Sequence, residues 1–143
     1  MAPIALSHDL PPACVFQAAA DYQIPPSVLY AIRKVEGGTL GKSSLNTNGT
    51  RDYGPMQINT VWINRFKQNE NLTAQVVASD PCIAIRSAAY VLRWELNRTG
   101  TDFWRGVGNY HSKTPALNLR YRQKIQAHAI RYDQHLRKIG WIQ

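Results

Sequence analysis

The sequence lacks long apolar runs, internal repeats and low-complexity segments. Its longest apolar stretches fall well short of the ~20 residues that a membrane-spanning helix needs, so we expect a soluble chain. Residues 1–12 contain no basic region followed by an apolar run, so we expect no signal peptide in this sequence. A length of 143 residues without a linker predicts a single domain over residues 1–143.

Cysteine and histidine are scarce. The two cysteines, Cys14 and Cys82, are too few for a disulfide framework, which leaves two alternatives. They are either buried free thiols or one disulfide that closes a long loop and requires an oxidising compartment. The four histidines show no metal-ligand spacing, so we expect no metal and no cofactor.

Acidic residues are also few. Nine Asp and Glu against seventeen Lys and Arg give a formal net charge of +8, which suits a polyanion such as nucleic acid or an anionic cell wall. The basic residues are scattered, and no zinc-finger spacing or RNP-type motif accompanies them, so we expect no nucleic-acid partner.

The apolar pattern predicts a chain that is almost entirely helical. Pro12, Pro26, Pro81 and Pro115 stand where a first helical turn tolerates proline. The expected helices cover residues 12–22, 26–36, 56–66, 72–77, 81–99, 103–107 and 115 to beyond 136. Residues 39–53 and 108–114 are polar and predict surface loops, and loops as long as the first are usually functional.

Glu36 is the most informative single residue. It ends an apolar helix directly after Val35 and precedes Gly37 and Gly38. Burial there would remove solvent from the carboxyl, raise its pKa and keep it protonated near neutral pH, as a general acid requires. The alternative is an exposed residue at a helix end, and position alone does not decide between the two.

Three later segments strengthen the first interpretation. Asp-Tyr-Gly-Pro-Met-Gln-Ile-Asn spans residues 52–59, where Gln57 and Asn59 offer amide groups that suit sugar hydroxyl and acetamido groups. Tyr110, in Gly-Asn-Tyr-His-Ser, could stack on a sugar ring, and Tyr121, in Asn-Leu-Arg-Tyr, could reach Glu36 from the last helix. Taken singly, either tyrosine could equally be a core residue.

This order of motifs, together with Asp-Pro-Cys at residues 80–82, resembles the soluble lytic transglycosylase catalytic domain from about Cys14 to Ile125. It is most similar to the small members that accompany type III and type IV secretion, conjugation and pilus systems. The resemblance implies a lysozyme-like, all-α fold with a substrate groove, Glu36 at its floor, and a Cys14–Cys82 disulfide formed in the periplasm.

The same resemblance implies a monomeric, periplasmic or secreted enzyme that acts on peptidoglycan glycan strands, with secretion or conjugation components as further partners. It would cleave the bond between N-acetylmuramic acid and N-acetylglucosamine and leave 1,6-anhydro ends. Glu36 is the expected catalytic residue. The expected substrate-binding residues are Tyr53, Met56, Gln57, Asn59, Tyr110, His111 and Tyr121.

Three positions depart from the family pattern. Gly37 replaces a serine that helps to orient the catalytic carboxylate, Pro55 replaces a leucine, and His111 replaces an asparagine that contacts the acetamido group. Two alternatives to the transglycosylase therefore stay open. One is a lysozyme-type hydrolase that uses Asp52 to position water, and the other is a catalytically weak peptidoglycan-binding adaptor.

The other acids receive structural interpretations. Asp80 is expected to cap a helix, and Glu95 and Asp102 are expected to be surface groups or caps.

Overall fold

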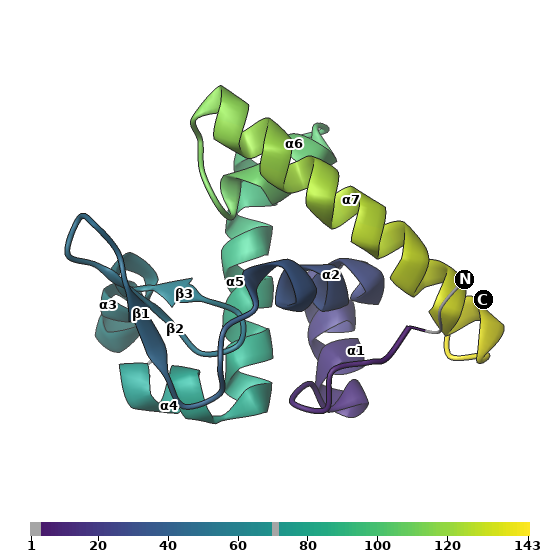
Figure 1. Cartoon of the computed structure of the whole chain (residues 1–143), viewed down its shortest axis with the longest axis horizontal. Helices are drawn as coiled ribbons and strands as arrows, with labels where there is room; N and C mark the ends of the chain where they lie inside the picture. The colour runs from purple at the N-terminus through teal and green to yellow at the C-terminus, as the bar shows by residue number, and fades with distance from the viewer. Residues whose placement is uncertain (1–3, 70–71) are drawn as a thin grey trace.

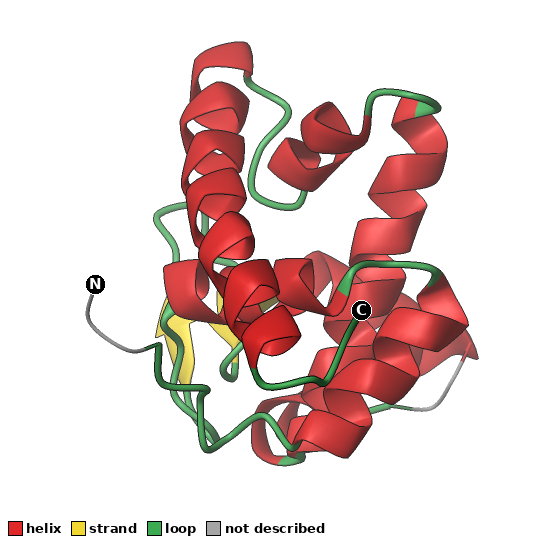
Figure 2. Cartoon of the chain, turned by 90° about the vertical axis from the view of Figure 1, so that its right-hand side faces the viewer, coloured by secondary structure: helices red, strands yellow, loops and turns green. Residues whose placement is uncertain are grey.

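The structure is a computed structural model that describes residues 4–69 and 72–143. These ranges hold seven helices and one small three-stranded sheet, so the expectation of a mainly helical fold is confirmed. Figure 2 shows that the strands form one small patch beside the helices. The helices are α1 (Pro12–Tyr22), α2 (Pro26–Glu36), α3 (Thr60–Asn69), α4 (Ala74–Ser79), α5 (Pro81–Thr99), α6 (Phe103–Asn109) and α7 (Pro115–Lys138).

Local sequence signals determine where several helices begin and end. α5 begins with Pro81, and the Asp80 carboxylate accepts hydrogen bonds from the backbone N–H groups of Cys82 and Ile83. Asp102 caps α6 by accepting from the backbone N–H of Arg105. The Asp80 cap was expected, and Asp102 takes the second of its two expected roles, because a short acidic side chain satisfies N–H groups that have no partner inside the helix.

The first polar segment is not a structureless loop, which corrects the sequence interpretation. β1 (Ser43–Leu45) and β2 (Arg51–Tyr53) form an antiparallel hairpin, and β3 (Ile58–Asn59) pairs with β2. Asn48 fixes the turn of the hairpin by accepting from the backbone N–H and the hydroxyl of Thr50. The strands were missed because they are short, and all of β1 is exposed, so no apolar alternation marks it.

The expected helix from Met56 was also wrong at its start. α3 begins at Thr60, after the residues of β3. Ile58 is buried in β3, and it would also be buried on the apolar face of a helix. A short apolar run therefore could not distinguish a strand from a helix here.

α5 runs through the centre of the molecule (Figure 1). The sheet, α3 and α4 lie on one side of it and α1 and α2 on the other, while α7 crosses over α2. The core joins these parts through fully buried side chains that include Leu29 and Ile32 of α2, Ile85 and Leu92 of α5, and Ile125 of α7. The packing places the end of α2 beside the turn between β2 and β3.

A disulfide joins Cys14 of α1 to Cys82 of α5, with a Cα–Cα distance of 5.3 Å. The disulfide alternative is therefore confirmed and the free-thiol alternative is wrong. Within residues 4–69 and 72–143, no helix is both long enough and apolar enough to cross a membrane.

Candidate active site

Glu36 is the last residue of α2, and its side chain points out of the core into a groove. Burial raises the pKa of this carboxyl from 4.5 to about 7. A hydrogen bond from Tyr121 acts in the opposite direction, and the nearby negative charge of Asp52 raises the pKa further. The raised pKa agrees with the sequence prediction and keeps a large fraction of Glu36 protonated at neutral pH.

Tyr121 of α7 holds the Glu36 carboxyl in place. Its hydroxyl donates a hydrogen bond to Oε2 of Glu36 at 2.7 Å. Burial raises the pKa of Tyr121 well above 10, so this hydroxyl stays protonated. His111 stacks on the Tyr121 ring at 5.0 Å between centroids, and Tyr110 stacks on it at 6.4 Å. His111, one of the three departures from the family pattern, thus stacks on the ring whose hydroxyl contacts Glu36.

Gly37 has a local role that explains the missing serine. It ends α2 in the left-handed conformation, with φ of +66°. This conformation costs glycine little and strains a serine, so the chain ends α2 sharply here. The residue next to Glu36 thus offers the carboxyl no side-chain hydroxyl, and the Tyr121 hydroxyl of α7 contacts it.

A groove of about 590 Å³ extends from Glu36 between the sheet and α5. One wall consists of polar residues of the hairpin and β3, including Asp52 and Asn59. The other wall belongs to α3 and α5 and carries the tryptophans Trp62 and Trp94. A second cavity, of about 320 Å³, lies on the other side of Glu36 and His111 and is lined by Arg120 and Lys124 of α7. Glu36 therefore lines both cavities.

The structure brings most of the predicted site residues together. Gln57, Asn59, Tyr110 and His111 line the groove with Glu36, and Tyr121 contacts Glu36 from the second cavity.

Two predicted residues lie elsewhere. Met56 is fully buried in the core, because the turn before β3 directs its side chain inward, so this side chain does not line the groove. Tyr53 is half-buried against the core and does not belong to the groove lining. The backbone carbonyl of Met56 nevertheless contacts a residue of the groove, because it accepts a 2.8 Å hydrogen bond from the Tyr110 hydroxyl.

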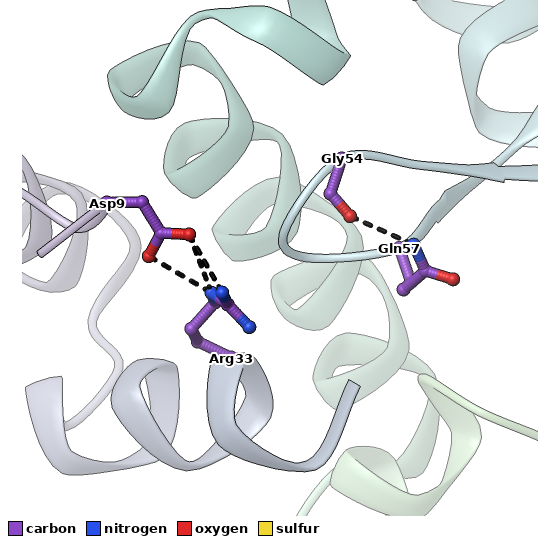
Figure 3. A network of polar contacts seen from close by, with 4 residues as sticks. All are labelled: Asp9, Arg33, Gly54 and Gln57. Atoms are coloured by element: carbon purple, nitrogen blue, oxygen red, sulfur yellow. Dashed lines mark hydrogen bonds and ion pairs between the residues drawn. The ribbon is translucent and has the colours of Figure 1, made fainter. Parts of the chain in front are cut away.

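The predicted amides are largely engaged within the protein. Gln57 donates from Nε2 to the backbone oxygen of Gly54 at 2.9 Å (Figure 3), and its Oε1 accepts from the Ser44 hydroxyl. Asn59 donates from Nδ2 to Oδ1 of Asp52 at 2.9 Å. These bonds shape the groove wall and fix the direction of the Asp52 carboxylate.

An ion pair anchors α2 at a second point. Arg33, one turn before Glu36, forms a forked ion pair with Asp9, in which Nη2 approaches Oδ2 to 2.8 Å (Figure 3). This partly buried pair ties the N-terminal segment to the helix that presents Glu36.

Sequence reasoning missed Glu95, Trp62 and Trp94. Glu95 was expected at the surface or in a cap, but only 5% of it is exposed and it lines the groove. The available signal was its helical spacing, because Glu95 falls on the same apolar stripe of α5 as Ala88 and Leu92. Within the described residues, no cluster of three or more His, Cys, Asp or Glu could hold a metal ion.

Comparison with known proteins identifies relatives. The family described as "Transglycosylase SLT domain" matches residues 13–131. The chain is 34% identical over 113 residues to Protein IpgF of Shigella flexneri, and 31% identical over 117 residues to Invasion protein IagB of Salmonella typhimurium. Each alignment covers 78% of this chain and 72% of the relative. The resemblance inferred from the motifs is thereby confirmed.

Proposed function

Because the chain belongs to the transglycosylase SLT domain family, we propose that Glu36 is the single acid and base of a peptidoglycan lytic transglycosylase. The observation that carries this assignment is the half-buried Glu36 carboxyl, whose pKa is about 7 and which Tyr121 orients between two cavities. Peptidoglycan is the substrate, and the enzyme cleaves its glycan strand.

In the first step, the protonated Glu36 donates its proton to the glycosidic oxygen between N-acetylmuramic acid and N-acetylglucosamine. The bond from C1 to this oxygen breaks, and N-acetylglucosamine leaves with a new hydroxyl. The acetamido oxygen of the muramic residue stabilises the positive charge at C1, as in other substrate-assisted glycosidases. A pKa near 7 suits this step. At neutral pH a large fraction of Glu36 is protonated, and the acid is still strong enough to transfer its proton.

In the second step, the Glu36 carboxylate removes the proton of the muramic C6 hydroxyl. The C6 oxygen then forms a bond to C1 and displaces the acetamido oxygen, which gives the 1,6-anhydro end. Glu36 is again protonated, no water is consumed, and the cycle is closed. Tyr121 donates to Oε2 throughout, which stabilises the carboxylate form that the second step requires.

Product analysis on purified peptidoglycan tests this function. We expect soluble fragments that end in 1,6-anhydro-muramic acid, detected by mass spectrometry, and no fragments from Glu36→Gln. The Gln side chain keeps an oxygen that can accept from Tyr121, so the variant should fold normally by circular dichroism. Full activity in Glu36→Gln would contradict the proposal. Folded wild type that binds peptidoglycan without releasing fragments would instead identify a wall-binding adaptor.

One observation favours a second candidate, a lysozyme-type hydrolase. Asp52 lines the same groove as Glu36, and Asn59 fixes its carboxylate direction. A second carboxylate in this place could activate or position water for attack at C1. Reducing muramic ends among the products, instead of anhydro ends, would favour this candidate.

The enzyme acts in the periplasm, where peptidoglycan lies, and the Cys14–Cys82 disulfide agrees with that oxidising compartment. We further propose that it opens the wall locally for a secretion or related machine and works as a monomer of one domain. The proposed role beside a secretion machine is supported by the word "invasion" in the name of one relative and by the resemblance to the small, machine-associated members.

A further inference from the structure

Glu95 is a buried carboxylate whose place in the fold no structural interaction explains. Only 5% of the residue is exposed, and its Oε2 atom has no hydrogen-bond partner among the described residues. The ion pairs of the same ranges do not include it. A buried acceptor without a donor destabilises the fold, and a leucine or glutamine would fill this position of α5 at less cost.

The position of Glu95 indicates what supplies the missing donors. It lies on α5 in the lining of the same groove as Glu36, directly beside Trp94. Trp94 is itself held by Arg65, whose guanidinium carbon lies 3.8 Å from the ring centroid. The groove lining thus contains both the carboxylate and an aromatic ring, a combination that suits a sugar ring with several hydroxyl donors.

We propose that Glu95 is a substrate-binding residue that accepts hydrogen bonds from an N-acetylglucosamine unit of the glycan strand. This inference rests on the proposed function of the groove. A carboxylate oxygen accepts hydrogen bonds, so it pairs with a ligand group that carries a proton to donate. The C3 hydroxyl of N-acetylglucosamine is such a donor, whereas in N-acetylmuramic acid an ether that has no proton to donate replaces it. Glu95 thus favours one of the two alternating sugars.

Binding in an inactive background tests this proposal. In Glu36→Gln, titration with chitotetraose, the tetramer of N-acetylglucosamine, should change the fluorescence of Trp62 and Trp94. We expect Glu95→Leu or Glu95→Gln, added to Glu36→Gln, to weaken this binding at least tenfold. The matched control is Asp133→Asn, which removes the same charge from an exposed ion pair of α7 and should leave the affinity unchanged. Equal affinity for chitotetraose in Glu36→Gln with and without the Glu95 substitution would overturn the proposal.

Stability and kinetics separate binding from a structural role. Since the described residues offer Oε2 of Glu95 no hydrogen bond that a substitution could remove, the melting temperature of Glu95→Leu should stay the same or rise. In the active enzyme, Glu95→Gln should raise KM for peptidoglycan with little change in kcat or in the pH profile. A lower melting temperature with unchanged KM would show a structural role and overturn the proposal.

Two further outcomes are distinguishable. If Glu95 variants lose affinity for peptidoglycan but not for chitotetraose, the assignment to N-acetylglucosamine is wrong. If wild type releases no fragments from peptidoglycan, the proposed catalytic function fails. The chitotetraose titration would still decide whether Glu95 binds sugar, because it requires no turnover.

Discussion

At the scale of single residues, the proposed mechanism requires Glu36 to act in two protonation states. Desolvation favours the protonated acid, whereas the Tyr121 hydroxyl favours the carboxylate, and the balance puts the pKa at about 7. Neither influence alone would suit both steps. A fully solvated Glu36 would give up its proton far below neutral pH, and a buried one without Tyr121 would hold its proton too firmly to act as a base.

This balance predicts how the stability conferred by Glu36 depends on pH. The folded pKa of about 7 exceeds the ordinary 4.5, so the fold favours the protonated form. The contribution is fully present below pH 4.5 and is lost as the pH rises through 7, at about 1.4 kcal/mol per pH unit. We expect Glu36→Gln to gain about 3 kcal/mol in unfolding free energy relative to wild type between pH 4 and pH 8.

Urea denaturation of both proteins at the two pH values measures this gain. The comparison cancels the titration of all other groups, because the two proteins differ only at residue 36. A difference that stays constant with pH would mean that Glu36 is solvated and that the proposed acid step lacks its basis.

At the scale of elements, the site depends on the close approach of the α2 end to the turn between β2 and β3. A Cβ atom at Gly38 would collide with the backbone oxygen of Gly54 and with Nε2 of Gln57. These are the two groups that bond to each other across the turn. The glycine after Gly37 therefore lets the sheet reach the catalytic helix, and it sets the distance between Glu36 and the groove wall.

Gly38→Ala should consequently separate the two elements. We expect a loss of about 1–3 kcal/mol in unfolding free energy from overpacking. We also expect kcat to fall by about two orders of magnitude, because small displacements of catalytic groups are costly.

Gly140→Ala provides the control for this variant. Gly140 has a positive φ of +80° near the C-terminus and open space around its Cα, so the substitution adds strain without a collision. It should lower stability slightly and leave kcat unchanged. Normal turnover by Gly38→Ala would show that the approach of α2 to the sheet is not needed for catalysis.

At the scale of the whole molecule, α5 connects the disulfide to the substrate groove. Cys82 lies in its first turn, and Glu95 lies about 20 Å further along the helix axis at 1.5 Å per residue. The covalent link to α1 thus restrains the end of α5 that is remote from the groove. Its effect should be on stability and not on the chemistry.

We expect the double variant Cys14→Ala, Cys82→Ala to lose about 4 kcal/mol of unfolding free energy, from the restored freedom of a loop of 68 residues. Its kcat at 25 °C should match that of wild type as long as it is folded. Wild type in reductant should approach the stability of the variant. If reductant also destabilised the double variant, which lacks this disulfide, the effect of reductant on wild type could not be assigned to the loss of the Cys14–Cys82 bond.

The sequence by itself determined the features that depend on local patterns. Helix periodicity, the prolines at helix starts and the Asp80 cap followed from residues close together in the chain, whereas the burial that raises the pKa of Glu36 did not. The motif order also identified the family before any coordinates, since four spaced segments agree with it.

Only the tertiary structure decided which distant residues meet. The small sheet depends on pairing between strands too short and polar to leave a pattern, and the direction of Met56 depends on the turn before β3. Glu95 looked like a surface carboxylate in the sequence. It lines a groove whose opposite wall belongs to the sheet, which is distant from α5 in the chain. The Tyr121 bond to Glu36, suspected from the motifs, needed the packing of α7 on α2, because no local rule brings residues 85 positions apart into contact.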